Sequence, residues 1–98
     1  MPAHPLAPIE KIDPELFARI GRTREFVYAD GALPAKVKYL IALALDAAHG
    51  AADGVASLAR MAKEHGATME EIAETIRVTN YIAGVGAVYT AARGLAAL

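Results

Sequence analysis

The stretch PAKVKYLIALALDAAHGAADGVASLARMAKEHGATMEEI, residues 34–72, decides the fold of this chain. It reads as two alanine-rich helices joined by a tight turn at His49 and Gly50, followed by the start of a further helix. The first of these helices is predicted over about residues 34–49, because apolar residues recur there at i, i+3, i+4, i+7 and i+8. These residues are Val37, Leu40, Ile41, Ala44 and Leu45, and the flanks of the helix are apolar too, as expected for a helix that is buried on most sides.

Clear start and stop signals surround the second helix, predicted over about residues 52–64. Its expected inner stripe is Val55, Leu58, Ala59 and Ala62. Gly66 suits the left-handed position that follows a helix end. The run Thr68-Met69-Glu70-Glu71 fits a capping box, in which Thr68 caps the next helix and Glu71 reaches back to it. That helix is expected to continue to a break at Gly84, and a last helix to cover about residues 85–97.

Prolines dominate the N-terminal end of the chain. Because Pro2, Pro5 and Pro8 are spaced so as to disfavour a helix, residues 1–9 are predicted to form an extended arm. Asp13 then precedes Pro14, which is the pattern of an N-cap followed by proline at the first helical position. A helix is therefore expected over residues 14–28. No apolar–polar alternation persists, so we predict an all-α fold of about five helices in one domain, residues 10–98.

Composition favours a small helical protein that self-associates. The chain has 98 residues, of which 55% are hydrophobic, and alanine is the most frequent. Alanine favours helices and lets them approach closely. A chain this short cannot easily hide so much apolar surface, so a homo-oligomer is expected. The net charge of −1 comes without a basic block, which argues against a nucleic-acid partner.

Three features that the sequence lacks limit the chemistry and the cellular location that we expect. The chain has no cysteine, so it supplies neither disulfides nor thiol chemistry. The N-terminal residues show no charged and apolar pattern of a signal peptide. The longest uncharged stretch, residues 78–92, is shorter than the roughly 20 residues that a membrane span needs. A soluble, cytoplasmic protein without a membrane partner is therefore expected.

Three motifs together resemble a known family. These are K-x-K-x-L-I-A-L-A-x-x-x-A-x-G at residues 36–50, A-x-x-x-G-A-T-x-E-E-I at 62–72 and Y-x-A-G at 81–84. The pattern, within residues 36–93, resembles the carboxymuconolactone decarboxylase family, which includes the alkylhydroperoxidase D-like proteins. The resemblance implies a small all-helical fold, assembled as a trimer or a hexamer.

The same resemblance implies a redox site that this chain has lost. In the redox branch, a Cys-x-x-Cys pair, a histidine and a glutamate form the reactive centre. The cysteine positions correspond to Ala51 and Gly54, the histidine to Leu58 and the glutamate to Tyr39. No thiolate is then present to attack a peroxide. The decarboxylase branch keeps the histidine. Because this chain has Leu58 at that position, the expectation of the decarboxylase reaction is weakened as well.

A polar cluster near the turn is the remaining candidate for catalysis. Asp46 and His49 lie three residues apart, and Asp53 follows just beyond the turn. Neighbouring carboxylates favour a histidine that titrates near neutrality, which suits a general acid or base. His49 and Asp53 are therefore the candidate catalytic residues, with Asp46 as a ligand-binding residue. The alternative is structural, with Asp53 favouring a helix N-terminus, His49 a helix C-terminus and Asp46 solvated. No metal site is expected.

Three further residues are candidate ligand contacts. Tyr39, at the glutamate position of the family, would offer a phenol donor, and Lys38 would hold a carboxylate-bearing ligand. Tyr81 precedes the Gly84 break and would add a polar group to the same pocket. The alternative places Tyr39 in an interface between solvated lysines, and Tyr81 at a helix bend.

Three functions stay open at this point. The first is a cofactor-independent small-molecule enzyme, of lyase or isomerase type, or a ligand binder. The second is a non-enzymatic helical oligomer that serves as a binding or interaction module. The third, a peroxidase-like antioxidant protein, has the least support because the chain lacks thiols.

Overall fold

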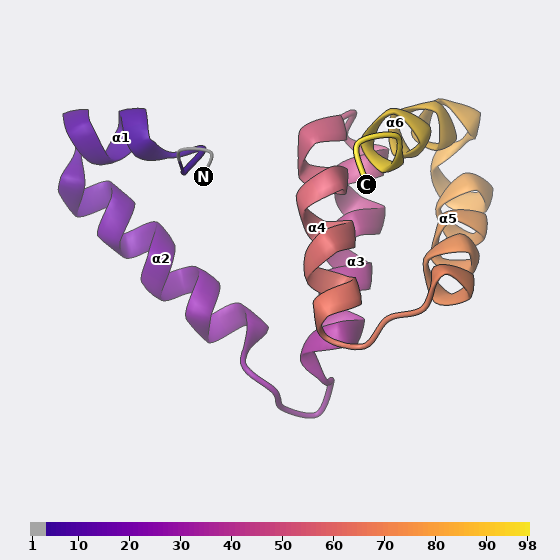
Figure 1. Ribbon diagram of the computed structural model, residues 1–98, viewed down its shortest axis with the longest axis horizontal. Coiled ribbons are helices and arrows are strands. Elements are labelled where there is room, and N and C mark those ends of the chain that lie inside the picture. The colour runs from indigo at the N-terminus through magenta and orange to yellow at the C-terminus, as the bar shows by residue number, and fades with distance from the viewer. Residues whose placement is uncertain (1–3) are drawn as a thin grey trace.

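Residues 4–98 are described by a computed structural model, and within them the chain forms six helices and no strand (Figure 1). The helices are α1 (Ala7–Ile12), α2 (Pro14–Tyr28), α3 (Ala35–Ala48), α4 (Ala52–Glu64), α5 (Met69–Ala83) and α6 (Val85–Leu95). The all-α prediction is confirmed. The predicted helix count of about five is one too low.

The additional helix corrects the predicted N-terminal arm. Residues 7–9 are helical in α1, where an extended chain was expected. Pro8 lies in the first turn of α1, where a helix leaves its N–H groups without internal partners, so proline costs no hydrogen bond there. Residues 1–3 of the predicted arm lie outside the described residues.

Local signals place the helix ends where the sequence predicts them. The Asp13 carboxylate accepts the Leu16 N–H at 3.0 Å and caps α2. At α5 the capping box is complete, because Thr68 Oγ1 accepts the Glu71 N–H at 3.1 Å and Glu71 Oε1 accepts the Thr68 N–H at 2.8 Å. Gly66 and Gly84 both adopt positive φ angles at helix ends, as glycine readily does.

The core lies among α3, α4, α5 and α6. Its largest fully buried side chains are Leu43, Val55 and Ile72. Small residues let the helices approach: a Cβ at Gly94 would lie 2.7 Å from the Ala52 carbonyl oxygen and from Val55, so α6 sits almost directly on α4. The alanine bias of the sequence therefore produces close helix packing.

Helix α3 is buried on one face, whereas the sequence predicted burial on most sides. Ala35, Tyr39, Leu43 and Ala47 are buried. The periodic apolar residues of the sequence line an open apolar groove of about 370 Å³ between α3 and α5, here called the α3–α5 groove, formed by Val37, Leu40, Ile41, Ala44, Leu45, Thr75 and Val78. Because α3 is apolar around most of its circumference, its periodicity does not select one face. The face with more small residues packs inside.

Helices α1 and α2 stand away from this body, as Figure 1 shows. Neither helix contains a buried residue. The radius of gyration, 14.1 Å, exceeds the about 13 Å typical of a compact chain of this length. An isolated helix of this size is marginal in water, so α2 needs a covering surface.

The C-terminal end of α2 is attached to α3 by several contacts. The Tyr28 ring stacks on Tyr39 with 4.1 Å between ring centroids. Lys38 Nζ donates a hydrogen bond to the Ala29 carbonyl, and the Asp30 carboxylate accepts the Ala35 N–H at 2.7 Å. These contacts hold the two helices at an angle and leave a space between them.

Among the helices of residues 4–98, none combines the length and the apolar character required to cross a bilayer.

Candidate functional site

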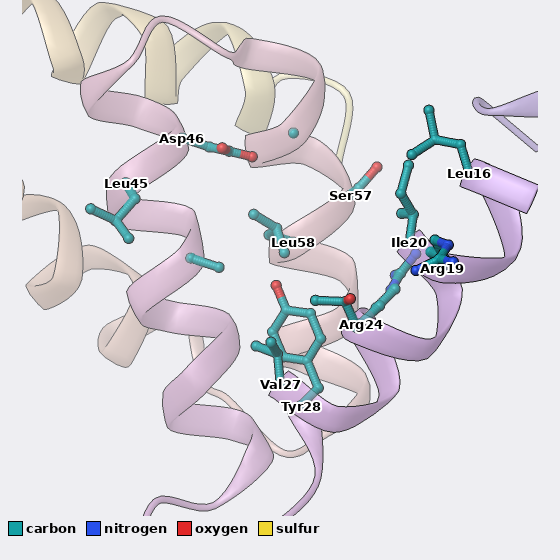
Figure 2. Close-up of a pocket in the computed structure, with 13 residues that line it drawn as sticks. Leu16, Arg19, Ile20, Arg24, Val27, Tyr28, Leu45, Asp46, Ser57 and Leu58 are labelled. Atoms are coloured by element: carbon teal, nitrogen blue, oxygen red, sulfur yellow. The ribbon is translucent and has the colours of Figure 1, made fainter. Parts of the chain in front are cut away.

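A cavity of about 720 Å³ lies between α2, α3 and α4 (Figure 2). Its walls are mainly apolar, with a few polar groups directed into the space. The lining residues are Leu16, Arg19, Ile20, Thr23, Arg24, Val27 and Tyr28 of α2; Ala42, Leu45 and Asp46 of α3; and Gly54, Ser57 and Leu58 of α4. We call this space the α2–α4 cavity.

Helical spacing explains how each element presents these side chains. On α2, residues 16, 20, 23, 24 and 27 recur at three or four positions and share one face. On α3, Ala42, Leu45 and Asp46 have the same spacing. On α4, Gly54, Ser57 and Leu58 do so too. Three helix faces therefore converge on one space.

Two charged groups face the cavity without a protein partner. Within residues 4–98, neither Arg24 nor Asp46 makes a side-chain hydrogen bond or an ion pair. Arg19, by contrast, pairs with Glu15 at 3.3 Å. A guanidinium from α2 and a carboxylate from α3 are thus both free to engage a ligand.

Tyr28 contributes a phenol to the same wall. Figure 2 shows its hydroxyl directed into the cavity, toward Leu58. Burial raises the pKa of the Tyr28 phenol above its ordinary value of 10.0; nearby Tyr39 and Asp46 also raise this pKa, while Arg24 opposes them. At neutral pH Tyr28 is therefore a neutral group that can donate a hydrogen bond.

Asp46 and Gly54 fit against each other across the α3–α4 contact. The side chain of Asp46 extends from α3 toward the beginning of α4 (Figure 2). A Cβ atom at position 54 would overlap Asp46 Oδ2. The carboxylate therefore occupies space that any side chain at position 54 would need.

The predicted catalytic cluster does not assemble at this cavity. Asp46 lines it, but His49 and Asp53 are exposed and do not. Successive helix residues point about 100° apart, so Asp53 is turned away from the wall that Gly54 forms. Within the described part of the chain, no three His, Cys, Asp or Glu side chains are placed to hold a metal ion.

The predicted ligand contacts other than Asp46 lie elsewhere. Lys38 is half-buried and donates to the Ala29 carbonyl, beside a hollow next to the cavity. Tyr39 is buried in the core between Tyr28 and His65, with its ring 4.9 Å from the His65 ring. Tyr81 is 86% exposed on α5 and does not line the cavity.

The sequence analysis did not predict the α2 residues of the cavity. Arg24 and Tyr28 of α2, together with Ser57 of α4, were not among the predicted site residues, although they are polar groups of the lining. A signal was present, since Arg24 lies within the apolar stripe that Leu16, Ile20 and Val27 form. A cation inside such a stripe points to a face that is neither fully buried nor simply solvated.

The positions that the sequence resemblance assigns to a redox centre fall partly at this cavity. Gly54 and Leu58 line it, and Ala51 lies just before α4. Tyr39 lies behind Tyr28 and does not reach the space. With no cysteine in the chain, these positions supply no thiol.

Comparison with known proteins agrees with this architecture. Among curated proteins, none matches the sequence significantly. An apo crystal structure of a carboxymuconolactone decarboxylase family protein from Legionella pneumophila is similar, with a TM-score of 0.86 and 33% sequence identity over 94% of this chain and 82% of that chain. The model of the carboxymuconolactone decarboxylase family matches residues 14–97. The chain therefore belongs to the carboxymuconolactone decarboxylase family, as a member without cysteine.

Proposed function

We propose that this protein binds a small, largely apolar molecule bearing a carboxylate in the α2–α4 cavity, and that it does so without thiol chemistry or a cofactor. The observation that carries the proposal is the cavity itself, with its unpaired Arg24 among apolar side chains. Its volume of about 720 Å³ lies within the range of roughly 300–1,000 Å³ typical of small-molecule sites.

The lining residues suit a ligand with two kinds of surface. Leu16, Ile20, Val27 and Leu58 offer an apolar wall for a ring or a short chain. Arg24 offers a planar guanidinium that can bind a carboxylate with two hydrogen bonds. This cation takes the ligand-holding role that the sequence analysis assigned to Lys38, whose Nζ already bonds to the Ala29 carbonyl.

Any proton transfer in this cavity would fall to Asp46 and Tyr28. A half-buried carboxylate can accept a proton, and the neutral Tyr28 phenol can donate one. The catalytic role predicted for His49 and Asp53 stays a prediction, without support from their exposed positions. Turnover of a bound molecule would identify an enzyme, and binding alone a ligand-binding module.

The proposal is tested with two matched substitutions on α3. Ala42 faces the α2–α4 cavity, whereas Ala44 faces the α3–α5 groove, and both are half-buried. We expect Ala42→Phe to weaken binding of indole-3-acetate by about tenfold or more, because the new ring fills the cavity. Ala44→Phe should leave the affinity unchanged.

Ligand fluorescence reports this binding directly, because the chain has no tryptophan. Circular dichroism checks that both variants stay folded. Failure of the unmodified protein to bind indole-3-acetate, or equal affinity of the two variants, would contradict the proposal.

We also propose that the protein self-associates, with a second copy covering the α3–α5 groove. The groove continues into a ridge of exposed residues at the α5–α6 corner, formed by Val78, Tyr81, Ile82, Val85 and Tyr89, each at least 63% exposed. Ile41 and Leu45, 46% and 55% exposed, extend this apolar surface along α3. A contiguous patch of this many exposed apolar side chains is unusual on a monomer and marks a protein interaction surface.

Self-association is tested by light scattering coupled to size-exclusion chromatography. We expect the unmodified chain to elute as an oligomer, a trimer or a hexamer, and Ile41→Glu to shift it toward smaller species because a charge then enters the groove. Ala73→Glu places the same charge on an exposed position of α5 that does not line the groove. A folded monomer at micromolar concentration for the unmodified protein would contradict the proposal.

A further inference from the structure

Asp46 supplies the carboxylate of the cavity, and no group of residues 4–98 donates a hydrogen bond to it. Its side chain is half-buried at the beginning of α4, and no hydrogen bond within residues 4–98 satisfies it. A partly buried charged acceptor is stabilised when a donor reaches it. Arg24 lies on a different wall, formed by α2 (Figure 2).

The backbone conformation at Gly54 does not require glycine. The positive φ angles in residues 4–98 belong to Gly50, Gly66 and Gly84, so Gly54 has ordinary helical geometry inside α4. Glycine is disfavoured at such a position relative to alanine. What the missing side chain provides is space, because a Cβ there would overlap the Asp46 carboxylate.

This overlap involves the end of a rotatable side chain. Substitution of Gly54 would therefore turn the Asp46 carboxylate out of its place without forcing the helices apart. Gly94 is different, since a Cβ there would meet the Ala52 backbone and the Val55 side chain in the core. The absence of a side chain at Gly54 thus leaves room for the Asp46 carboxylate, whereas the absence of one at Gly94 allows α6 to pack closely on α4.

We propose that Gly54 is a specificity-determining residue: it lets the Asp46 carboxylate act as hydrogen-bond acceptor of the cavity, so the ligand carries a hydroxyl or amino donor at the end away from its carboxylate. This inference rests on the proposed function. It adds the second polar end of the ligand: Arg24 binds the carboxylate, the apolar walls hold the body, and Asp46 accepts the donor.

The test compares indole-3-acetate with its derivatives hydroxylated at each open position of the benzene ring. For the unmodified protein, we expect at least one derivative to bind about tenfold more tightly than the parent compound, because a hydrogen bond to a charged acceptor contributes that much. Asp46→Ala and Gly54→Ala should each abolish this preference. The readout is the ratio of the two affinities within each variant, so that a change in the affinity for indole-3-acetate itself does not count toward the result.

Gly86→Ala is the matched control. Gly86 is also a helical glycine, and a Cβ there meets nothing within 4 Å. The control variant should keep the preference for the hydroxylated probe, and thermal melts of all variants show whether they fold.

Each outcome has a distinct meaning. Equal binding of indole-3-acetate and all its derivatives by the unmodified protein would overturn this inference and leave the proposed function standing. A preference that survives Gly54→Ala would overturn the role of Gly54. If no probe binds, the proposed function fails and this inference fails with it.

Discussion

Glu71 joins the capped start of α5 to α3. Its Oε1 accepts the Thr68 N–H at 2.8 Å, and its Oε2 accepts a hydrogen bond from Lys36 Nζ at 3.0 Å. The Thr68 N–H, and then Lys36, lower the pKa of this carboxyl below its ordinary value of 4.5. One side chain thus completes a helix cap and forms an ion pair between two helices.

Acid should therefore weaken the fold through Glu71. Because its pKa is lowered in the folded state, its contribution to stability is fully present above pH 4.5 and is lost as the pH falls through the lowered pKa. We expect Glu71→Gln to be less stable than the unmodified protein at neutral pH, with a smaller further loss on acidification. Urea unfolding followed by circular dichroism at pH 7 and below pH 4 measures both.

Glu70→Gln is the matched control, since Glu70 lies in the same turn and is exposed. Identical pH dependence of stability in both variants and in the unmodified protein would contradict the assignment to Glu71.

At the residue scale, the sequence predicted the capping residues but only one residue of the cavity. Asp13, Thr68 and Glu71 cap helices through hydrogen bonds to residues three positions away in the sequence. Their capping roles therefore follow from local spacing. Asp46 was expected to contact a ligand and does line the cavity. The positions of His49 and Asp53 depend on how the chain turns between two helices, which spacing along the sequence does not determine.

At the scale of elements, helix ends followed from local signals, whereas buried faces did not. The predicted α4 stripe is largely correct, because Val55, Ala59 and Ala62 are buried and Leu58 packs against the core. For α3, the predicted burial on most sides is wrong, because Ile41 and Leu45 are 46% and 55% exposed. That helix is apolar nearly all round, so only the size of neighbouring side chains decides which face packs inside.

Helix α2 shows the same limit more strongly. Its bounds agree with the predicted 14–28, but none of its residues is buried in this chain. Its apolar stripe lines the α2–α4 cavity, and Phe26, on another face of the helix, is 83% exposed. An isolated helix of this length is marginal in water, so α2 needs a covering surface to be stable.

At the scale of the whole molecule, the α2–α4 cavity is assembled from three consecutive helices, α2, α3 and α4. The cavity draws residues from positions 16 to 58, and no single motif contains them. Two of the positions that the resemblance assigned to a redox centre, Gly54 and Leu58, line the cavity. Arg24 and Tyr28 could not be found in the same way, since the angle between α2 and α3 depends on a few contacts at the end of α2.

A nuclear magnetic resonance titration shows whether ligands enter the α2–α4 cavity. Indole-3-acetate is added to the ¹⁵N-labelled protein, and the shift of each backbone amide is followed. We expect the largest changes at the cavity residues of α3 and α4, namely Ala42, Asp46, Gly54, Ser57 and Leu58. Changes confined to the α3–α5 groove, at Val37, Thr75 and Val78, or no change at saturating probe, would contradict this expectation.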